Sequence, residues 1–290
     1  MTESLEVLLD AHALLGECPL WDDLTGTLLW VDILRHEVHR LDPATGLDRS
    51  LTLAEPVGAV ALREGGGLVA AAGMSFGELD EDSGAFTKWH QVSRGDRMND
   101  GACDPAGRFW AGTMTNAQTP GAASLYALDP STLQVTEKLH DVTLSNGLAW
   151  SPDAEILYYV DTVCERIEAF DYDTATAALS GRRTVVDLHD IDGRPDGLTV
   201  DSEGRLWVAM AKGRVVRCYN ADAALQHVVS IPAPIVTSCT FGGDEFGELY
   251  VTTGEWPATP AQLLDYPNAG AIFRLTGLGA SGLPANRFAG

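Results

Sequence analysis

The sequence has no long hydrophobic run and little positive charge. No stretch of about 18 consecutive apolar residues occurs, so no segment is suited to span a bilayer as a helix. The 19 Lys and Arg are outnumbered by 41 Asp and Glu, and a net charge of −22 disfavours binding to nucleic acid or to an anionic membrane surface. The start, MTESLEVLLD, lacks the basic region of a secretory signal. We therefore expect a cytoplasmic protein with neither nucleic-acid nor membrane partners.

Paired cysteines and long amphipathic helices are also missing. The five cysteines are odd in number and none forms a C-x-x-C pair, which argues against a disulfide framework or a zinc knuckle. The 30 Gly and 14 Pro interrupt the chain too often for helical repeats. Because 45% of the residues are nevertheless hydrophobic, the chain can bury a full core.

Instead of amphipathic helices, the sequence contains a short apolar repeat. Six short apolar segments share one pattern, and their central residues lie 39 to 49 positions apart. Each follows an apolar stretch and a turn, and each precedes a second alternating segment that often ends in Asp. The six segments are 29–31, 68–70, 109–111, 158–160, 206–208 and 249–251.

Each repeat has the size of one four-stranded propeller blade, although its fourth strand is less clearly marked. The sequence therefore predicts an all-β fold, a six-bladed β-propeller, as a single domain over residues 1–290. We expect the strand near 6–9 to pair into the last blade and close the ring, because closure protects sheet edges. The aromatic residues at the segment centres are expected to pack between neighbouring sheets.

Four repeats carry a polar residue where the innermost strand begins. They are Glu17, Asn99, Asn146 and Asp196, which precede their segment centres by 11 or 13 positions. In a propeller these positions converge on the central channel, and two carboxylates with two amides form an all-oxygen set suited to Ca²⁺, Mg²⁺ or Mn²⁺. Any one Asn-Gly or Asp-Gly could be a simple turn dipeptide. Four at one point of the repeat favour a site.

The motifs around these residues resemble those of the senescence marker protein/regucalcin/gluconolactonase family. The matching segments are GECPLW, RMNDG, DPAGRFWAGTM, SNGLAWS, PDGL, FGG and AGAIFRL, which occur in order from about residue 15 to residue 279. As a set they are specific, and they cover nearly the whole chain.

The resemblance implies a hydrolase that opens a sugar-acid lactone to the aldonic acid. It implies one divalent cation, Ca²⁺, Zn²⁺, Mg²⁺ or Mn²⁺, with Glu17, Asn146 and Asp196 as ligands. Asp196 also matches the general base of the family, and Arg97 and Asn99 match its substrate-binding pair. The expected partner is a small sugar lactone, and the expected state is a monomer or weak homodimer.

One departure from the family bears on specificity. Some members carry an acidic residue where this chain has Asn116-Ala117, so the sugar preference of one member does not transfer to this chain. Two other functions stay open. One is an esterase for other cyclic or activated esters, and the other is a calcium-binding regulatory or interaction propeller without turnover, because fold alone does not decide activity.

Overall fold

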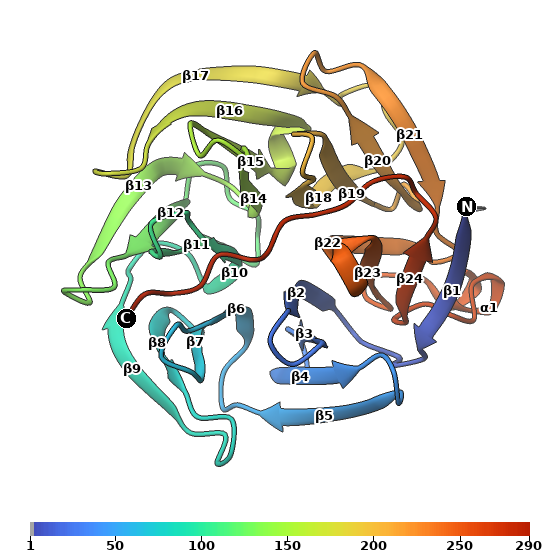
Figure 1. Cartoon of the computed structure of the whole chain (residues 1–290), viewed down its shortest axis with the longest axis horizontal. Helices are drawn as coiled ribbons and strands as arrows, with labels where there is room; N and C mark the ends of the chain where they lie inside the picture. Colours follow the sequence, from blue (N-terminus) through green and yellow to red (C-terminus); the bar gives the residue numbers. More distant parts are fainter. Residues whose placement is uncertain (1–2) are drawn as a thin grey trace.

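The computed structural model describes residues 3–290 as a ring of six β-sheet blades around a central channel (Figure 1). Four blades are separate four-stranded sheets, and the other two join into one eight-stranded sheet through a single pair, Ala211 and Ile235. This confirms the predicted all-β six-bladed propeller. The first two positions of the predicted domain 1–290 lie outside the described residues.

The first three blades follow each other along the chain, each built from its inner strand outward. Blade 1 contains β2 (Gly16–Asp22), β3 (Thr27–Asp32), β4 (Glu37–Asp42) and β5 (Leu47–Thr52). Blade 2 contains β6 (Val57–Leu62), β7 (Leu68–Ala72), β8 (Ser75–Leu79) and β9 (Phe86–Gln91). Blade 3 contains β10 (Arg97–Cys103), β11 (Phe109–Met114), β12 (Ala123–Leu128) and β13 (Val135–Val142).

The remaining blades repeat this order, and the last borrows its outer strand from the start of the chain. Blade 4 contains β14 (Ser145–Trp150), β15 (Ile156–Asp161), β16 (Arg166–Asp173) and β17 (Ala178–Asp187). Blade 5 contains β18 (Arg194–Val200), β19 (Leu206–Ala211), β20 (Val215–Tyr219) and β21 (Leu225–Ser230). Blade 6 contains β22 (Ile235–Gly242), β23 (Glu248–Gly254), β24 (Ile272–Thr276) and β1 (Ser4–Leu9). The pairing of β1 with β24 confirms the predicted ring closure.

Helical structure is confined to connections. The described residues contain two 3₁₀ turns, η1 (Thr162–Cys164) and η2 (Asp244–Phe246), and one short helix, α1 (Pro260–Asp265). No helix in the described part of the chain combines the length and apolar character needed to cross a membrane.

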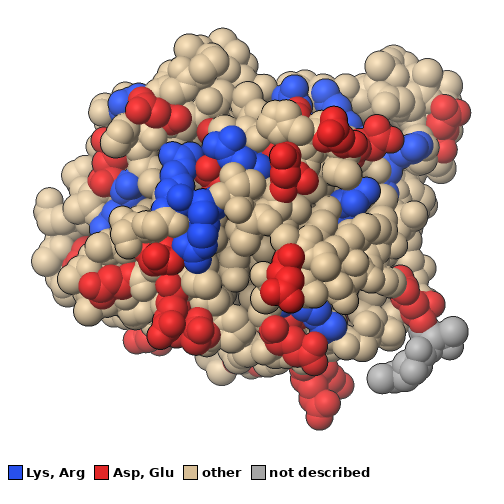
Figure 2. All heavy atoms as spheres, turned by 90° about the horizontal axis from the view of Figure 1, so that it is seen from above, with Lys and Arg blue, Asp and Glu red and all other residues tan. Residues whose placement is uncertain are grey.

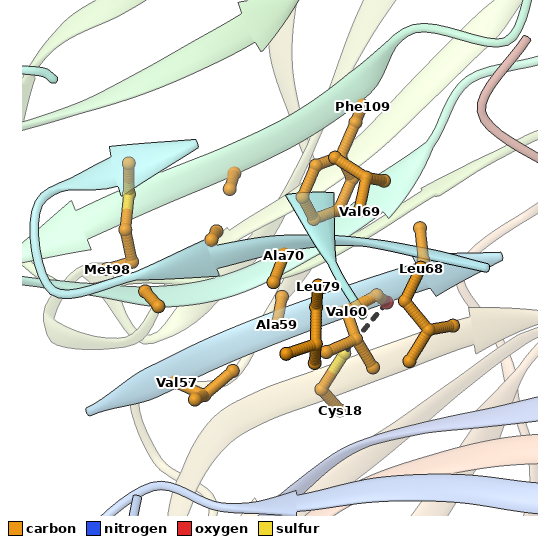
Figure 3. Close-up of a cluster of buried hydrophobic side chains, with 14 of the residues drawn as sticks. Cys18, Val57, Ala59, Val60, Leu68, Val69, Ala70, Leu79, Met98 and Phe109 are labelled. Atoms are coloured by element: carbon orange, nitrogen blue, oxygen red, sulfur yellow. Dashed lines mark hydrogen bonds between the residues drawn. The ribbon is translucent and has the colours of Figure 1, made fainter. Parts of the chain in front are cut away.

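Aromatic side chains bind neighbouring blades together, as the sequence predicts. Trp110 of blade 3 packs edge-to-face against Trp150 of blade 4, with ring centroids 5.7 Å apart. Trp207 of blade 5 meets Phe241 of blade 6 in the same way at 5.5 Å, and such pairs add stability beyond their buried area. Smaller side chains pack in the hydrophobic core around blade 2. Figure 3 shows Val57, Ala59 and Val60 among the buried side chains of this core.

The C-terminal segment, residues 277–290, crosses one end of the channel (Figure 1). Near its end the Phe288 side chain is fully buried, and its backbone pairs with Leu62 and Glu64 of blade 2. The Arg287 guanidinium donates to Asp22 at 3.0 Å and to Asp23 at 2.7 Å in blade 1. The segment therefore ties several blades together across this face.

Charged side chains of both signs lie on the outer rim. On the face drawn in Figure 2, several Lys and Arg side chains gather left of the centre, and Asp and Glu side chains lie around and below them. Ion pairs such as Arg183 with Asp171, 2.7 Å apart, neutralise part of the basic charge of blade 4.

Candidate active site in the channel

Each inner strand carries a β-bulge at the level of the predicted site. In blade 1 the pairing runs from Glu17 opposite Val31 to Leu20 opposite Leu29, which leaves one extra residue on β2. The same break follows Met98 in β10, Ser145 in β14 and Pro195 in β18. Bulges redirect side chains and are common beside active sites, and here Asn99, Asn146 and Asp196 lie inside the breaks, while Glu17 is paired directly before one.

The inner strands of successive blades contact one another around the whole ring, and glycines permit the close approach. A Cβ atom on Gly147 would lie 2.7 Å from the carbonyl oxygen of Asp196, and one on Gly58 would lie 2.5 Å from that of Asn99. Such distances are shorter than van der Waals contact. Gly147 therefore allows β14 to approach β18 closely, so that the side-chain amide of Asn146 lies near the strand that carries Asp196.

A chain of hydrogen bonds connects three of the predicted residues. Arg97 Nη1 donates to Asn99 Oδ1 at 2.7 Å, and Asn99 Nδ2 donates to Asn146 Oδ1 at 3.0 Å. Asn146 Nδ2 then donates to the hydroxyl of Thr162 at 2.8 Å. Both amides are buried, and their orientation is fixed by these partners. Because a carbonyl oxygen has two lone pairs, Asn146 Oδ1 keeps one for a further partner.

The two predicted acids are buried in the same region. Glu17 is 5% exposed and Asp196 is 8% exposed. Burial, together with the negative charges of Asp196 and Asp100, raises the pKa of Glu17 well above its ordinary value. Burial and Asp100 likewise raise the pKa of Asp196. Glu17 is thus influenced by Asp196 and Asp100, and Arg97 interacts with both Glu17 and Asp196.

Asp100 is a third carboxylate that the sequence analysis missed as a site residue. It follows Asn99 inside the β10 bulge, is 7% exposed, and has its pKa raised to about 6 by burial. In the sequence, Asp100 precedes a glycine, and an Asp-Gly dipeptide is typical of a turn. In the structure, the bulge of β10 places Asp100 at the channel. Its position directly after Asn99, which belongs to the predicted substrate-binding pair, could have marked Asp100 as a candidate site residue.

The positive charge among these acids is insufficient to balance them. Arg97 is the basic residue that acts on both Glu17 and Asp196, and burial lowers its pKa to about 10 despite those acids. One oxygen of Asp196, Oδ1, is buried and has no hydrogen-bond partner among the described residues. Unpaired buried charge of this kind is costly unless a cation binds it.

The donor set fits a hard divalent cation. Glu17 and Asp196 offer carboxylate oxygens and Asn146 offers an amide oxygen, which are the ligands that Ca²⁺ and Mg²⁺ prefer. Within residues 3–290 no three His, Cys, Asp or Glu side chains are arranged to hold a metal, so a set built on Glu17 and Asp196 would need the Asn146 amide as its third protein ligand. The fit therefore depends on the Asn99 to Asn146 hydrogen bond that orients it.

The position without the family's acidic residue lies beside another acid. The backbone N–H of Asn116 donates to Asp96 Oδ2 at 2.8 Å, and Asp96 immediately precedes Arg97. A carboxylate is thus present near Asn116 although the loop itself supplies none. It comes from the connection that enters β10.

Comparison with known proteins identifies relatives of this chain. A family profile described as "SMP-30/Gluconolactonase/LRE-like region" matches residues 15–255. Regucalcin of Oryctolagus cuniculus is 39% identical over 295 residues, covering 99% of this chain and 98% of the relative.

Two solved structures have the same architecture. A calcium-binding regucalcin from Agrobacterium tumefaciens superposes with a TM-score of 0.92 at 28% identity, covering 97% of this chain and 96% of that one. A gluconolactonase from Xanthomonas campestris superposes with a TM-score of 0.76 at 24% identity, covering 94% and 89%. At this identity the second likeness concerns the fold alone.

Proposed function

This chain belongs to the SMP-30/gluconolactonase/LRE family, and from that premise we propose that it is a metal-dependent hydrolase that opens a sugar-acid lactone to the free aldonic acid. The observation that carries the proposal is the unpartnered Oδ1 of Asp196, buried among carboxylates that one arginine does not balance. Relatives of this chain include proteins named gluconolactonase and regucalcin.

Glu17, Asn146 and Asp196 would hold the divalent cation. When bound, a cation of this kind polarises a lactone carbonyl and stabilises the negative charge that develops on its oxygen. The protein contributes a fixed set of oxygens, because Asn146 is oriented by hydrogen bonds on both sides of its amide. These ligands would come from three blades, with Asn146 and Asp196 inside the bulges of β14 and β18 and Glu17 directly before that of β2.

Asp196 is the proposed general base. One oxygen of its carboxylate would contact the cation, and the other can accept a proton from the attacking water. Burial and the neighbouring Asp100 raise the pKa of Asp196, and an ionised carboxylate with a raised pKa is a stronger base. The proton then lies on Asp196 when the ester bond opens, where it is available to the leaving ring oxygen.

Arg97 and Asn99 are proposed to orient the sugar hydroxyls. The Arg97 guanidinium already donates to Asn99 Oδ1 and to the carbonyl oxygen of Met98, which holds it against the inner strand. Its remaining N–H groups can donate to the substrate, and the fork geometry of a guanidinium favours two neighbouring oxygens. Arg97 and Asn99 would thereby form the subsite that binds the sugar hydroxyls.

Arg97→Lys is expected to raise KM for an aldonolactone by about tenfold, while kcat changes less. The lysine keeps the charge but loses the planar fork, so one bond to Asn99 or one to the substrate is lost. Steady-state kinetics on the variant measure both constants. A variant with unchanged KM would remove Arg97 from the substrate site.

Removal of the cation is expected to lower stability. At a free cation concentration 100 times Kd the bound state is stabilised by about 2.7 kcal/mol, so Ca²⁺ should raise the melting temperature of chelator-stripped protein. In Glu17→Gln the same addition is expected to have a much smaller effect, because one charged ligand is gone. Differential scanning calorimetry of both proteins measures this, and an equal response in the variant would displace Glu17 from the site.

The test of the function is a pH-stat assay on chelator-stripped protein, with a panel of aldonolactones and divalent metals added back singly. The proposal expects metal-dependent acid release from at least one aldonolactone, at rates above those for aryl esters. Faster turnover of aryl esters would favour the esterase. Cation binding without any turnover would favour a calcium-binding module, as the description of the Agrobacterium relative suggests.

A further inference from the structure

A cavity lies in the channel, at the end crossed by the C-terminal segment. It encloses about 260 Å³ and is lined by residues from all six inner strands. Leu283, Pro284, Ala285 and Asn286 of the C-terminal segment complete its wall. Glu17, Arg97, Asn99, Asn146 and Asp196 do not line it, so the cavity is separate from the proposed lactone site.

Asp100 supplies the only formal charge among the lining residues. No Lys, Arg or His belongs to the cavity wall. Asp100 Oδ1 accepts a hydrogen bond from the Gly101 backbone at 2.7 Å, and no other hydrogen bond to this carboxylate exists within residues 3–290. With 7% of the residue exposed, the carboxylate is more than nine-tenths buried and borders the cavity. The second oxygen is therefore available to a ligand.

The rest of the wall is mainly apolar. The larger apolar side chains that line it are Leu20, Leu148, Trp150, Leu198 and Phe241. The Trp150 ring is fixed by edge-to-face contacts with Trp110 and Tyr172. A mostly apolar cavity with one or two well-placed polar groups is typical of a site for a small organic molecule.

We propose that this cavity binds a small organic cation, a primary alkylamine whose ammonium group pairs with Asp100. The apolar body of the amine would pack against the leucines, Trp150 and Phe241. An aromatic face close to a cation adds further attraction. The net charge of −22 also raises the local concentration of cations around the protein.

A bare metal ion suits the cavity less well. Asp100 is its one carboxylate, and no three His, Cys, Asp or Glu side chains in the described chain form a metal-binding group. An inorganic anion or a sugar acid would meet an uncompensated negative charge. An ammonium group needs a single carboxylate and few further acceptors, and the Ser238 hydroxyl in the same wall can be one of them.

The test is a titration of the full chain with n-butylamine, followed by isothermal calorimetry at fixed pH and ionic strength, with 1-butanol as the neutral probe of similar shape. We expect saturable binding of the amine at one site per chain and at least tenfold weaker binding of the alcohol. Equal affinities for the two would overturn the proposal, because the charge would then play no part.

Variants separate this cavity from the lactone site. Asp100→Asn is expected to weaken butylamine binding at least tenfold, while Asp96→Asn, which removes the same charge near Asn116, leaves it unchanged. Ala285→Trp, in the outer wall, is expected to obstruct the cavity and gives a second test that spares the channel acids. Undiminished binding in Asp100→Asn or in Ala285→Trp would refute the site.

Competition with Ca²⁺ distinguishes the cavity from the proposed cation site at Glu17, Asn146 and Asp196. Because the two are separate, we expect one amine per chain to bind even at saturating Ca²⁺, although the charge of the nearby cation weakens its affinity. Displacement of the amine by stoichiometric Ca²⁺ would mean that Asp100 belongs to the proposed cation site, and the proposal would fail. Neither result depends on whether a lactone is hydrolysed.

Discussion

Asp196→Asn is expected to lower kcat/KM for aldonolactone hydrolysis by at least about a thousandfold, which is the largest catalytic effect that the site predicts. The amide keeps the shape of the side chain but loses the proton acceptor and one negative ligand for the cation. Both losses act on the same step, since Asp196 is proposed to take the proton of the attacking water. The measurement is a pH-stat assay at saturating cation.

The same variant is expected to fold. The Asp196 carboxylate is buried beside Asp100, so replacing it with a neutral amide removes repulsion between like charges in the cation-free chain. Asp192→Asn is the matched control, because this exposed acid lies four residues earlier in the connection that enters β18. Near-normal activity in Asp196→Asn, or an equal loss in Asp192→Asn, would contradict the assignment of Asp196.

The buried strands could be predicted because their sequences repeat. The six apolar segments correspond to β3, β7, β11, β15, β19 and β23, each the second strand of its blade. Outer strands were harder to predict, because one face meets solvent and the apolar pattern fades. In β17 (Ala178–Asp187), for example, most residues are exposed. Their positions follow from pairing with the third strand rather than from their own composition.

The candidate site was predictable as a set of positions but not as a geometry. Sequence spacing brought Glu17, Asn146 and Asp196 to the starts of inner strands, and the structure places them there. The bulges depend on register between paired strands, and the sequence does not display register directly. For that reason Asp100 was missed, although it lies beside Asn99.

The route of the C-terminal segment could not be predicted either. Its sequence, GLGASGLPANRFAG, lacks strand periodicity, and its place is set by contacts with residues more than 200 positions away, such as that of Arg287 with Asp22. The cavity beneath this segment was therefore invisible at the level of sequence. Burial of Phe288 against blade 2 anchors the end of the chain over that cavity.

A recurrent acid stabilises the blades independently of the channel. Asp104, which has no solvent exposure, accepts hydrogen bonds from Trp110 Nε1 at 2.9 Å and from the Tyr172 hydroxyl at 2.5 Å. Asp201 repeats the arrangement in blade 5, where Trp207 Nε1 donates to it at 2.9 Å. Because Tyr172 belongs to blade 4, Asp104 also connects two blades.

Asp104→Ala is expected to reduce the free energy of unfolding by about 3–5 kcal/mol, the range found when one partner of a buried charged pair is removed. The change leaves the indole of Trp110, the hydroxyl of Tyr172 and the guanidinium of Arg108 without their shared acceptor. Urea unfolding followed by tryptophan fluorescence measures the loss. Asp129→Ala is the matched control, because Asp129 accepts similar bonds from Ser131 and Thr132 at the surface, and its loss should be far smaller. Equal losses in the two variants would show that burial of the acceptor does not decide its contribution.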